Sequence, residues 1–212
     1  MKQVYIRFMA PVVPETTDQL FKIIDLKIKD KYERLNLMLS SPGGSVFHGL
    51  SIYNYLKGAP IETYTYNFGS VDSIGVIIFC AGLKRFSVPH ARFLIHGVRF
   101  NINNSASFDE KELNEHYKSL LIDQANIAKV IADNCKKTQK KIEKDMNDRT
   151  TLNPEEAKKY GLVHDVKSEL FPLDAELYTI GEILNKPQNP FNFIMPQAAQ
   201  AFTRSEDLKI GT

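Results

Sequence analysis

The sequence predicts an α/β domain in which mostly parallel strands alternate with helices. Short segments rich in β-branched and aromatic residues recur between residues 4 and 166. Segments with apolar residues three or four positions apart separate them, and glycine or proline marks most junctions. After about Ser168 this alternation stops and prolines become frequent. We therefore expect one domain over residues 1–167 and a partly irregular carboxyl-terminal extension over residues 168–212.

The amino-terminal half is expected to contain three strands and three helices. Thr16 or Thr17 can cap the first helix, and Ser45 should begin the second. Gly69 and Ser70 should open the third helix, which is apolar almost all round and is therefore expected to be buried. The expected strands cover residues 4–9, 35–39 and 61–66, and the expected third helix covers residues 71–81.

The carboxyl-terminal half is expected to add three short strands and three helices. Ser107 and Glu110 form the S-x-x-E pattern of a capping box before a long helix. Thr138 can cap the next helix and Asn153 the last one, which should stop at Gly161. The expected strands cover residues 85–88, 92–96 and 162–166.

Composition and charge exclude several classes of function. The chain has 212 residues with a formal net charge of +2, and 25% of its residues are charged. This balance provides no basic surface of the kind that binds nucleic acid. Its two cysteines, Cys80 and Cys135, form neither a CxxC pair nor a cluster with histidine. We therefore interpret them as packing residues and expect no metal site and no cofactor.

The sequence contains no evident targeting or membrane segment. Its first residues alternate like a strand and lack the long apolar region of a signal peptide. No stretch approaches the roughly 18 apolar residues that a membrane span requires. The expected location is the cytoplasm, with no membrane partner.

Ser73 is the first candidate for chemistry. It follows Gly69 and Ser70 at the expected start of a buried helix, where unpaired amides favour developing negative charge. Small neighbours let a substrate backbone approach closely. A hydrolytic nucleophile needs such an accessible position, but a serine that only caps a helix would have the same surroundings.

Two further features are of the kind that completes a hydrolytic site. The turn Pro42-Gly43-Gly44 exposes amides that can bind an oxyanion, although an ordinary strand-to-helix turn explains it equally well. His96 ends an expected strand, so it can face a cleft as a general base or lie hydrogen-bonded in the core. The other histidines fall on helices, in a turn or beside the last expected strand, where no catalytic role is indicated.

Five motifs in order resemble those of the ATP-dependent Clp protease proteolytic subunit family. They read SSPGGS with GLSIY, GSVDSIG, AGLKRF with VPHA, FLIH, and EEAKKYGLV. The family's counterparts are SPGGS with IYD, G-x-A-A-S-M-G, AG with KR and LPN, V-M-I-H, and EEAxxYGL(I/V)D. The resemblance extends over about residues 4–167.

This resemblance implies the ClpP/crotonase-like fold, with repeated β-β-α type units and an outlying long helix. It implies a serine endopeptidase in which Ser73 is the nucleophile and His96 the general base. The amides of Gly44 and Ile74 would form the oxyanion hole. It also implies a homo-oligomeric ring, a heptamer or a double heptamer, whose chamber receives peptides or unfolded proteins.

The third member of the catalytic triad is where the sequence departs most from the family. Counting back from Leu152 without a gap places Arg149 where the family has aspartate. Asp148 lies one residue away and Asp145 lies further, so Asp148 is the predicted orienting residue. Asp72 stands beside Ser73 where the family has alanine. It would raise the pKa of His96 if it faced inward, or be solvated if it faced outward.

Two further departures concern assembly. The chain begins almost at its first expected strand, so we expect no counterpart of the family's axial loop, which contacts an ATP-driven unfoldase. Residues 97–104 lack the glycine-rich handle strand that lies beside the substrate and helps to join two rings. Partnership with an AAA+ unfoldase and the double-ring state are therefore left open.

Two other functions fit the same features. A Clp-like ring subunit without activity, which serves as a scaffold or assembles with active subunits, would explain why Arg149 stands at the ungapped aspartate position. An unreactive Ser73 would support it. A crotonase-type acyl-CoA enzyme would share the fold and a glycine-based oxyanion hole. Such enzymes usually rely on acidic residues in place of a serine–histidine pair.

Overall fold

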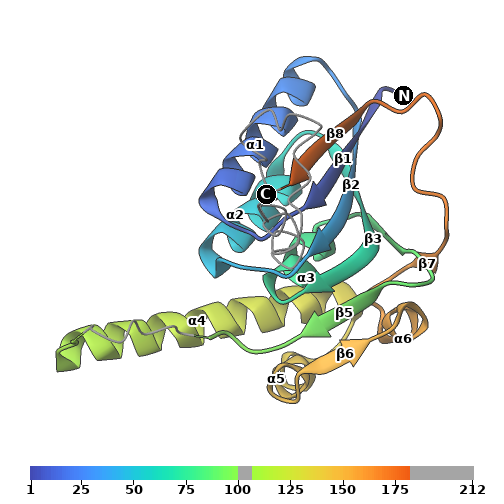
Figure 1. Cartoon of the computed structure of the whole chain (residues 1–212). Coiled ribbons are helices and arrows are strands. Elements are labelled where there is room, and N and C mark those ends of the chain that lie inside the picture. The colour runs from blue at the N-terminus through green and yellow to red at the C-terminus, as the bar shows by residue number, and fades with distance from the viewer. Residues whose placement is uncertain (100–106, 182–212) are drawn as a thin grey trace, which may run out of the picture. The chain divides into compact units, whose positions relative to one another are not determined.

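A computed structural model of the chain describes residues 1–99 and 107–181, which belong to a compact unit over Met1–Glu182. In this part of the chain, eight strands form one sheet in the order β6-β5-β3-β2-β1-β8, with β4 beside β3 and β7 beside β4 (Figure 1). All pairs are parallel except β5 with β6. The strands are β1 (Gln3–Met9), β2 (Arg34–Ser41), β3 (Glu62–Asp72), β4 (Lys84–Ser87), β5 (Arg92–Ile95), β6 (Thr150–Leu152), β7 (Asp165–Val166) and β8 (Leu177–Gly181).

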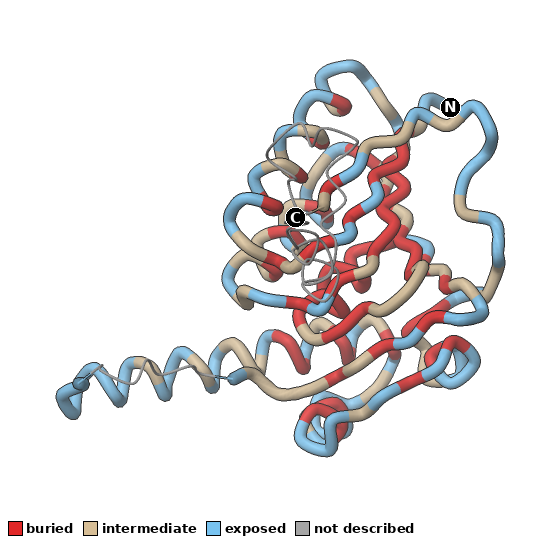
Figure 2. Tube along the Cα trace, viewed as in Figure 1, coloured by how far each residue is buried: buried red, intermediate tan, exposed pale blue. Residues whose placement is uncertain are grey.

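The helices connect these strands. They are α1 (Pro14–Lys29), α2 (Val46–Gly58), α3 (Ile74–Cys80), α4 (Glu110–Cys135), α5 (Gln139–Asn147) and α6 (Pro154–Tyr160). In Figure 1, α1 and α2 lie on one side of the sheet, and α4 projects well beyond it. Its projecting end is exposed in Figure 2, whereas its carboxyl-terminal half buries one face against the domain. Across the described residues, no helix is both long and apolar enough to cross a membrane.

The two faces of the sheet are covered differently. On β1, the side chains of Val4, Ile6 and Phe8 are fully buried and join the main core, to which all six described helices contribute. Tyr5 points to the opposite face, where it forms a smaller cluster with Met38 and Tyr66. Residues from the segment after β7 pack on that cluster, namely Leu170, Ala175 and Leu177. Alternation of the β-strand side chains therefore produces two separate cores.

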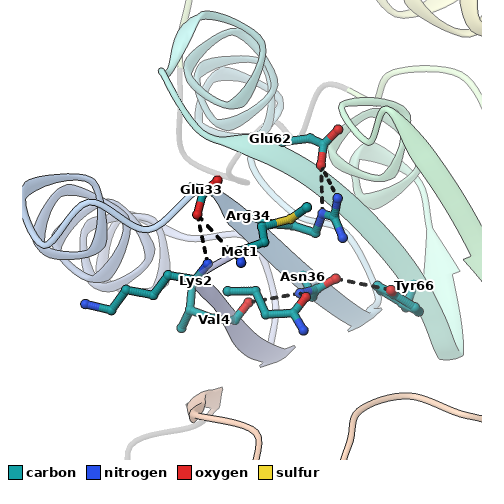
Figure 3. A network of polar contacts seen from close by, with 9 residues as sticks. Met1, Lys2, Val4, Glu33, Arg34, Asn36, Glu62 and Tyr66 are labelled. Carbon is teal, nitrogen blue, oxygen red and sulfur yellow. Dashed lines mark hydrogen bonds and ion pairs between the residues drawn. The ribbon is translucent and has the colours of Figure 1, made fainter.

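Polar contacts tie together the amino-terminal ends of the three central strands (Figure 3). The guanidinium of Arg34 on β2 donates to Glu62 on β3 at 2.7 Å. The amide of Asn36 donates to the carbonyl of Val4 on β1 at 3.4 Å, and the hydroxyl of Tyr66 donates to Asn36 at 3.2 Å. These bonds satisfy polar groups between the strands and help to hold their register.

Arg85 connects the elements that follow α3. Its guanidinium is buried and donates to the backbone oxygens of Gly82, Asn134, Gly161 and Leu162, over distances from 2.7 to 3.3 Å. These carbonyls lie at the ends of α3, α4 and α6, where helices leave carbonyl groups without internal partners. One side chain thus satisfies three helix ends.

The predicted fold class is confirmed, and most expected elements are present. Ser45, Thr138 and Asn153 each cap a helix through a side-chain oxygen, as expected. Gly161 has a φ of 92° after α6. The first helix begins earlier than expected, because Pro14 at its first position suits the helical φ. Neither Thr16 nor Thr17 is its cap, since both lie inside it.

Two other predicted boundaries are wrong. The expected helix over residues 71–81 begins only at Ile74, because Val71 still pairs with Phe93 in the sheet and β3 continues to Asp72. The long helix is capped by Asp109 with Glu112, and not by the pattern that begins at Ser107. Both pairs have the same three-residue spacing, so the spacing alone could not distinguish them.

The segment beyond Ser168 contains a strand that the sequence did not predict. The expected strand over residues 162–166 is reduced to β7, and β8 follows at Leu177–Gly181. It pairs in parallel with β1, from Tyr5 opposite Leu177 to Met9 opposite Gly181. Residues 182–212 of the expected extension lie outside the described residues.

A buried lysine fastens the approach to β8. Lys27 on α1 is 5% exposed, and its ammonium donates to the carboxylate of Glu176 at 2.7 Å. Glu176 also accepts hydrogen bonds from the hydroxyls of Tyr32 and Tyr178. These donors, Lys27 first, lower the pKa of Glu176 from 4.5 to about 2. The charged carboxylate is therefore the form that the fold stabilises.

We expect Glu176→Gln to lower the free energy of unfolding near neutral pH by about 1.5 kcal/mol, because a charged acceptor is lost. Because the pKa of Glu176 is lower in the folded state, its carboxylate stabilises the fold at pH values above its ordinary pKa of 4.5. This stabilisation is lost as the pH falls towards 2. The wild type should therefore lose more stability than the variant between about pH 6 and pH 3 in urea titrations. Glu115→Gln on exposed α4 is the control. Parallel pH profiles for wild type and Glu176→Gln would contradict this role.

Candidate active site

The turn at Gly43 and Gly44 is held against Val12, which lies in the short segment between β1 and α1. The amide of Val12 donates to the carbonyl of Gly43 at 2.8 Å, and the amide of Ser45 donates to the carbonyl of Val12 at 2.8 Å. The two glycines have φ values of 88° and 149°. A Cβ on Gly44 would lie 2.3 Å from the carbonyl oxygen of Val12, and a Cβ on Gly43 would lie 2.7 Å from the Cβ of Ser73. Residues without a side chain are therefore required at both positions.

Ser73 occupies the sharp junction between β3 and α3. Its φ is 58° and its ψ is −128°, a conformation that non-glycine residues rarely adopt. Its amide donates to the carbonyl of Leu94 on β5 at 2.8 Å, which anchors the junction to the sheet. Its hydroxyl makes no capping hydrogen bond to α3. This geometry therefore argues against the alternative that Ser73 only caps the helix.

A cavity of about 180 Å³ brings the candidate residues together. Ser73 and Ile74 from the β3–α3 junction, Gly44 from the glycine turn and His96 from the end of β5 all line it. Ser73 and His96 are both half-buried. The remaining lining residues are Val46, Gly97, Val98, Arg99 and Ile127.

The amides of Gly44 and Ile74 are placed as potential donors. The bridge to Val12 uses the carbonyl of Gly43 and the amide of Ser45, so the intervening amide of Gly44 takes no part in it. Ile74 is the first residue of α3, where an amide has no partner within the helix. Within residues 1–99 and 107–181, neither amide donates to another protein group.

His96 is oriented by the main chain. Its Nδ1 lies 2.7 Å from the carbonyl oxygen of Gly97. A carbonyl oxygen only accepts, so this contact assigns a hydrogen to Nδ1. In the neutral ring with this hydrogen, Nε2 carries the lone pair. The amide of Gly97 in turn donates to the carbonyl of Met146 at 3.1 Å. A neutral imidazole with a free Nε2 is the form that accepts a proton.

The structure does not bring Asp148 into this cavity. The carboxylate of Asp148 pairs with Lys144, is 52% exposed and lines a different cavity beside α5. Asp145 is buried and accepts from the hydroxyl of Tyr160 at 2.7 Å and from Lys141. Arg149, at the ungapped position of the family's aspartate, has a φ of 56°. None of these acidic side chains is a lining residue of the Ser73 cavity.

Asp72 faces away from His96. Its carboxylate accepts two hydrogen bonds from the guanidinium of Arg92, at 3.1 and 2.9 Å, and one from the hydroxyl of Ser70 at 2.8 Å. It lines a separate cavity of about 790 Å³ at the carboxyl ends of β1, β2 and β3. The alternative in which Asp72 points towards His96 is therefore excluded by this pairing. These hydrogen bonds hold Asp72, which directly precedes Ser73, in place.

Other nucleophiles and ligands are poorly placed. Cys80 and Cys135 are buried, and burial raises the pKa of Cys135 to about 11 and that of Cys80 further. Thiols in this state are not nucleophilic near neutral pH. Among the described residues, no group of three or more histidine, cysteine, aspartate or glutamate side chains is arranged to hold a metal ion.

Five lining residues of the Ser73 cavity were not singled out from the sequence. They are Val46, Gly97, Val98, Arg99 and Ile127. Gly97, Val98 and Arg99 directly follow His96 in the chain, which was an available signal. Ile127 lies on α4, and nothing in the sequence indicates which turn of that long helix reaches the cavity.

Comparison with known proteins identifies the family. The family model described as Clp protease matches residues 1–169. The chain belongs to the Clp protease family. This family member is 31% identical over 147 residues to the ATP-dependent Clp protease proteolytic subunit 2 of Corynebacterium glutamicum, covering 68% of this chain and 71% of that one. It is 29% identical over 155 residues to the corresponding subunit of Corynebacterium diphtheriae, covering 72% and 76%.

A solved structure supports the fold of this Clp protease family member. A mutant ClpP1 from Listeria monocytogenes superposes with a TM-score of 0.69 at 24% identity, covering 79% of this chain and 92% of that chain. The expected resemblance is thereby confirmed. Part of the segment that lacks the family's handle pattern, residues 100–106, lies outside the described residues.

We expect Gly44→Ala to destabilise the fold by about 1–3 kcal/mol, because its backbone conformation and the nearby Val12 carbonyl both oppose a side chain. Urea denaturation measures this change. Gly58→Ala is the matched control, since its Cβ would meet nothing within 4 Å, and we expect a change within about 1 kcal/mol. Equal stability of the two variants would show that the turn at Gly44 can relax.

Proposed function

We propose that this chain is a serine peptidase of the Clp type. Ser73 is the nucleophile, His96 is the general base, and the amides of Gly44 and Ile74 bind the oxyanion. The observation that carries the proposal is the single cavity that a strained serine, a histidine and two unpaired amides share. The proteolytic relatives of the chain support the same reaction class.

The reaction follows from the roles of these groups. Ser73 Oγ attacks the peptide carbonyl carbon while Nε2 of His96 takes its proton. The negative oxygen of the tetrahedral intermediate accepts hydrogen bonds from the two amides. His96 then gives the proton to the leaving amine, and an acyl-enzyme remains on Ser73. Water, deprotonated by the same Nε2, hydrolyses this ester and regenerates the serine.

In this scheme the carbonyl of Gly97 holds His96 in the active tautomer. The contact at 2.7 Å gives the ring orientation that an aspartate supplies in other serine peptidases. A carbonyl dipole stabilises the imidazolium less than a full negative charge does. We therefore expect a functional but slow enzyme.

Substrates and assembly follow from the family. We propose that peptides or unfolded proteins reach Ser73 inside a homo-oligomeric ring. Exposed apolar side chains on the projecting half of α4 support a subunit interface there, because such groups are rarely left in water. They are Leu113, Tyr117, Leu121 and Ile122.

We expect a fluorophosphonate probe to label the wild type on Ser73. Ser73→Ala should abolish labelling, and His96→Ala should slow it by about 10²- to 10⁴-fold, because the general base is lost. Labelling is followed by intact-mass spectrometry, with light scattering to record the assembly state. The matched controls are Ser51→Ala and His90→Ala, which lie outside the cavity and should label normally.

Three outcomes would contradict the proposal. Persistent labelling of Ser73→Ala would place the reactive group elsewhere. A folded, assembled wild type that resists labelling would favour the inactive ring subunit. Binding of an acyl-CoA with no labelling would favour the crotonase-type enzyme.

The orienting role that the sequence suggests for Asp148 can be tested directly. Its carboxylate is half in water and pairs with Lys144, so we expect Asp148→Asn to keep kcat/KM within about twofold. Hydrolysis of a fluorogenic peptide measures this ratio. A loss of about 10⁴-fold would instead support Asp148 as the residue that orients His96.

A further inference from the structure

A second cavity adjoins the one that holds Ser73. It has a volume of about 420 Å³ and shares Gly44, Val46, Val98 and Arg99 with the first cavity. A substrate chain lying against these shared residues would present side chains to both cavities. The far wall of the second cavity is one face of α4, formed by His116, Ser119, Leu120 and Asp123.

Asp123 is the acidic group in this second cavity. It lies one helical turn before Ile127, which lines the Ser73 cavity, so the same face of α4 serves both cavities. Its side chain is half-buried, and burial raises its pKa. In the described part of the chain, the Asp123 carboxylate has no hydrogen bond and no ion pair.

Other acidic groups on α4 have different surroundings. Asp133 is 65% exposed and pairs with Lys129 at 3.4 Å. Glu112 accepts from the amide of Asp109 at 2.9 Å in the capping box. Of these three residues, only Asp123 has a partly buried carboxylate that accepts no hydrogen bond from a described residue. A carboxylate in this state gains most from an incoming cation.

The shape of the second cavity suits a long cationic side chain. Val46, Val98 and Leu120 provide apolar wall, and the carboxylate of Asp123 provides a charged end. Lysine and arginine combine an apolar stem with a cationic head in the same way. Arg99 also lines the cavity, but its side chain is exposed, so water screens its charge more than it screens the half-buried Asp123.

We propose that Asp123 makes this cavity a subsite for a lysine or arginine side chain close to the bond that Ser73 attacks. This inference rests on the proposed peptidase function, because it assigns the second cavity to the substrate of Ser73. Asp123 contacts the substrate and not the reacting atoms, so it determines specificity. The substrate class is a peptide with a basic residue beside the scissile bond.

The test uses two fluorogenic peptides that differ only in lysine or norleucine beside the scissile bond. Norleucine keeps the stem and removes the ammonium group. For the full-length wild type we expect kcat/KM to be about tenfold higher for the lysine peptide, the usual size of one charge-assisted contact. Asp123→Asn should bring this ratio close to one. Asp133→Asn, on the same helix, should leave the ratio unchanged.

A second measurement separates this inference from the peptidase function. Fluorescence anisotropy of the same two peptides on Ser73→Ala measures binding without turnover. We expect the lysine peptide to bind about tenfold more tightly, and the added Asp123→Asn substitution to remove the difference. A ratio near one in the Ser73→Ala protein, or a ratio that survives Asp123→Asn, overturns the subsite.

The combined results distinguish the two failures. Labelling of Ser73 by fluorophosphonate without any lysine preference would retain the peptidase and overturn the subsite. Lysine-selective binding that depends on Asp123, in a protein that the probe does not label, would retain the subsite and overturn the peptidase.

Discussion

The close contact of the glycine turn with Val12 and Ser73 is the constraint on which the site depends. Gly44 is placed by two backbone hydrogen bonds that join its neighbours Gly43 and Ser45 to Val12, and Gly43 lies directly against Ser73. Three parallel strands therefore end at one point, and their main chains meet without intervening side chains. The conformation of Ser73 is then set by the sheet, because its amide is bound to β5 and the preceding Asp72 is held by Arg92. Strain at one residue is tolerated when its neighbours leave no alternative.

The same arrangement separates two electrostatic environments around Ser73. The carboxylate of Asp72 and the guanidinium of Arg92 neutralise one another on one side of the junction. On the other side, the cavity of Ser73 is lined by the His96 imidazole, by Arg99 and by main-chain groups of Gly44 and Ile74. The orienting carbonyl of Gly97 belongs to the segment that also forms the cavity wall. Fixed dipoles of this kind need no rearrangement as charge develops.

Much of this could be predicted from local sequence. The order of strands and helices followed from periodicity, and three of the helix starts followed from Ser45, Thr138 and Asn153. The sequence also singled out Ser73, His96 and the glycine turn, which the structure brings to one cavity.

The end of β3 was missed because an apolar run beside glycine suits a helix as well as a buried strand. The partner of Asp72 is set by a contact between β3 and β5, which local pattern does not encode. The absence of Asp148 from the Ser73 cavity likewise depends on where α5 packs, although its partner Lys144 is only four residues away. β8 was missed because a short strand at a sheet edge has a weak sequence signal.

The pairing of β8 with β1 has a consequence for the order of folding. Arg7 on β1 donates to Thr179 on β8 at 3.0 Å, and 172 positions separate the two residues in the sequence. Before β8 forms, one edge of β1 has no strand partner and can pair with other chains. Contacts between such distant segments form slowly, since a long loop must close first. The growing chain therefore carries an open, aggregation-prone edge on β1 until β8 has been made.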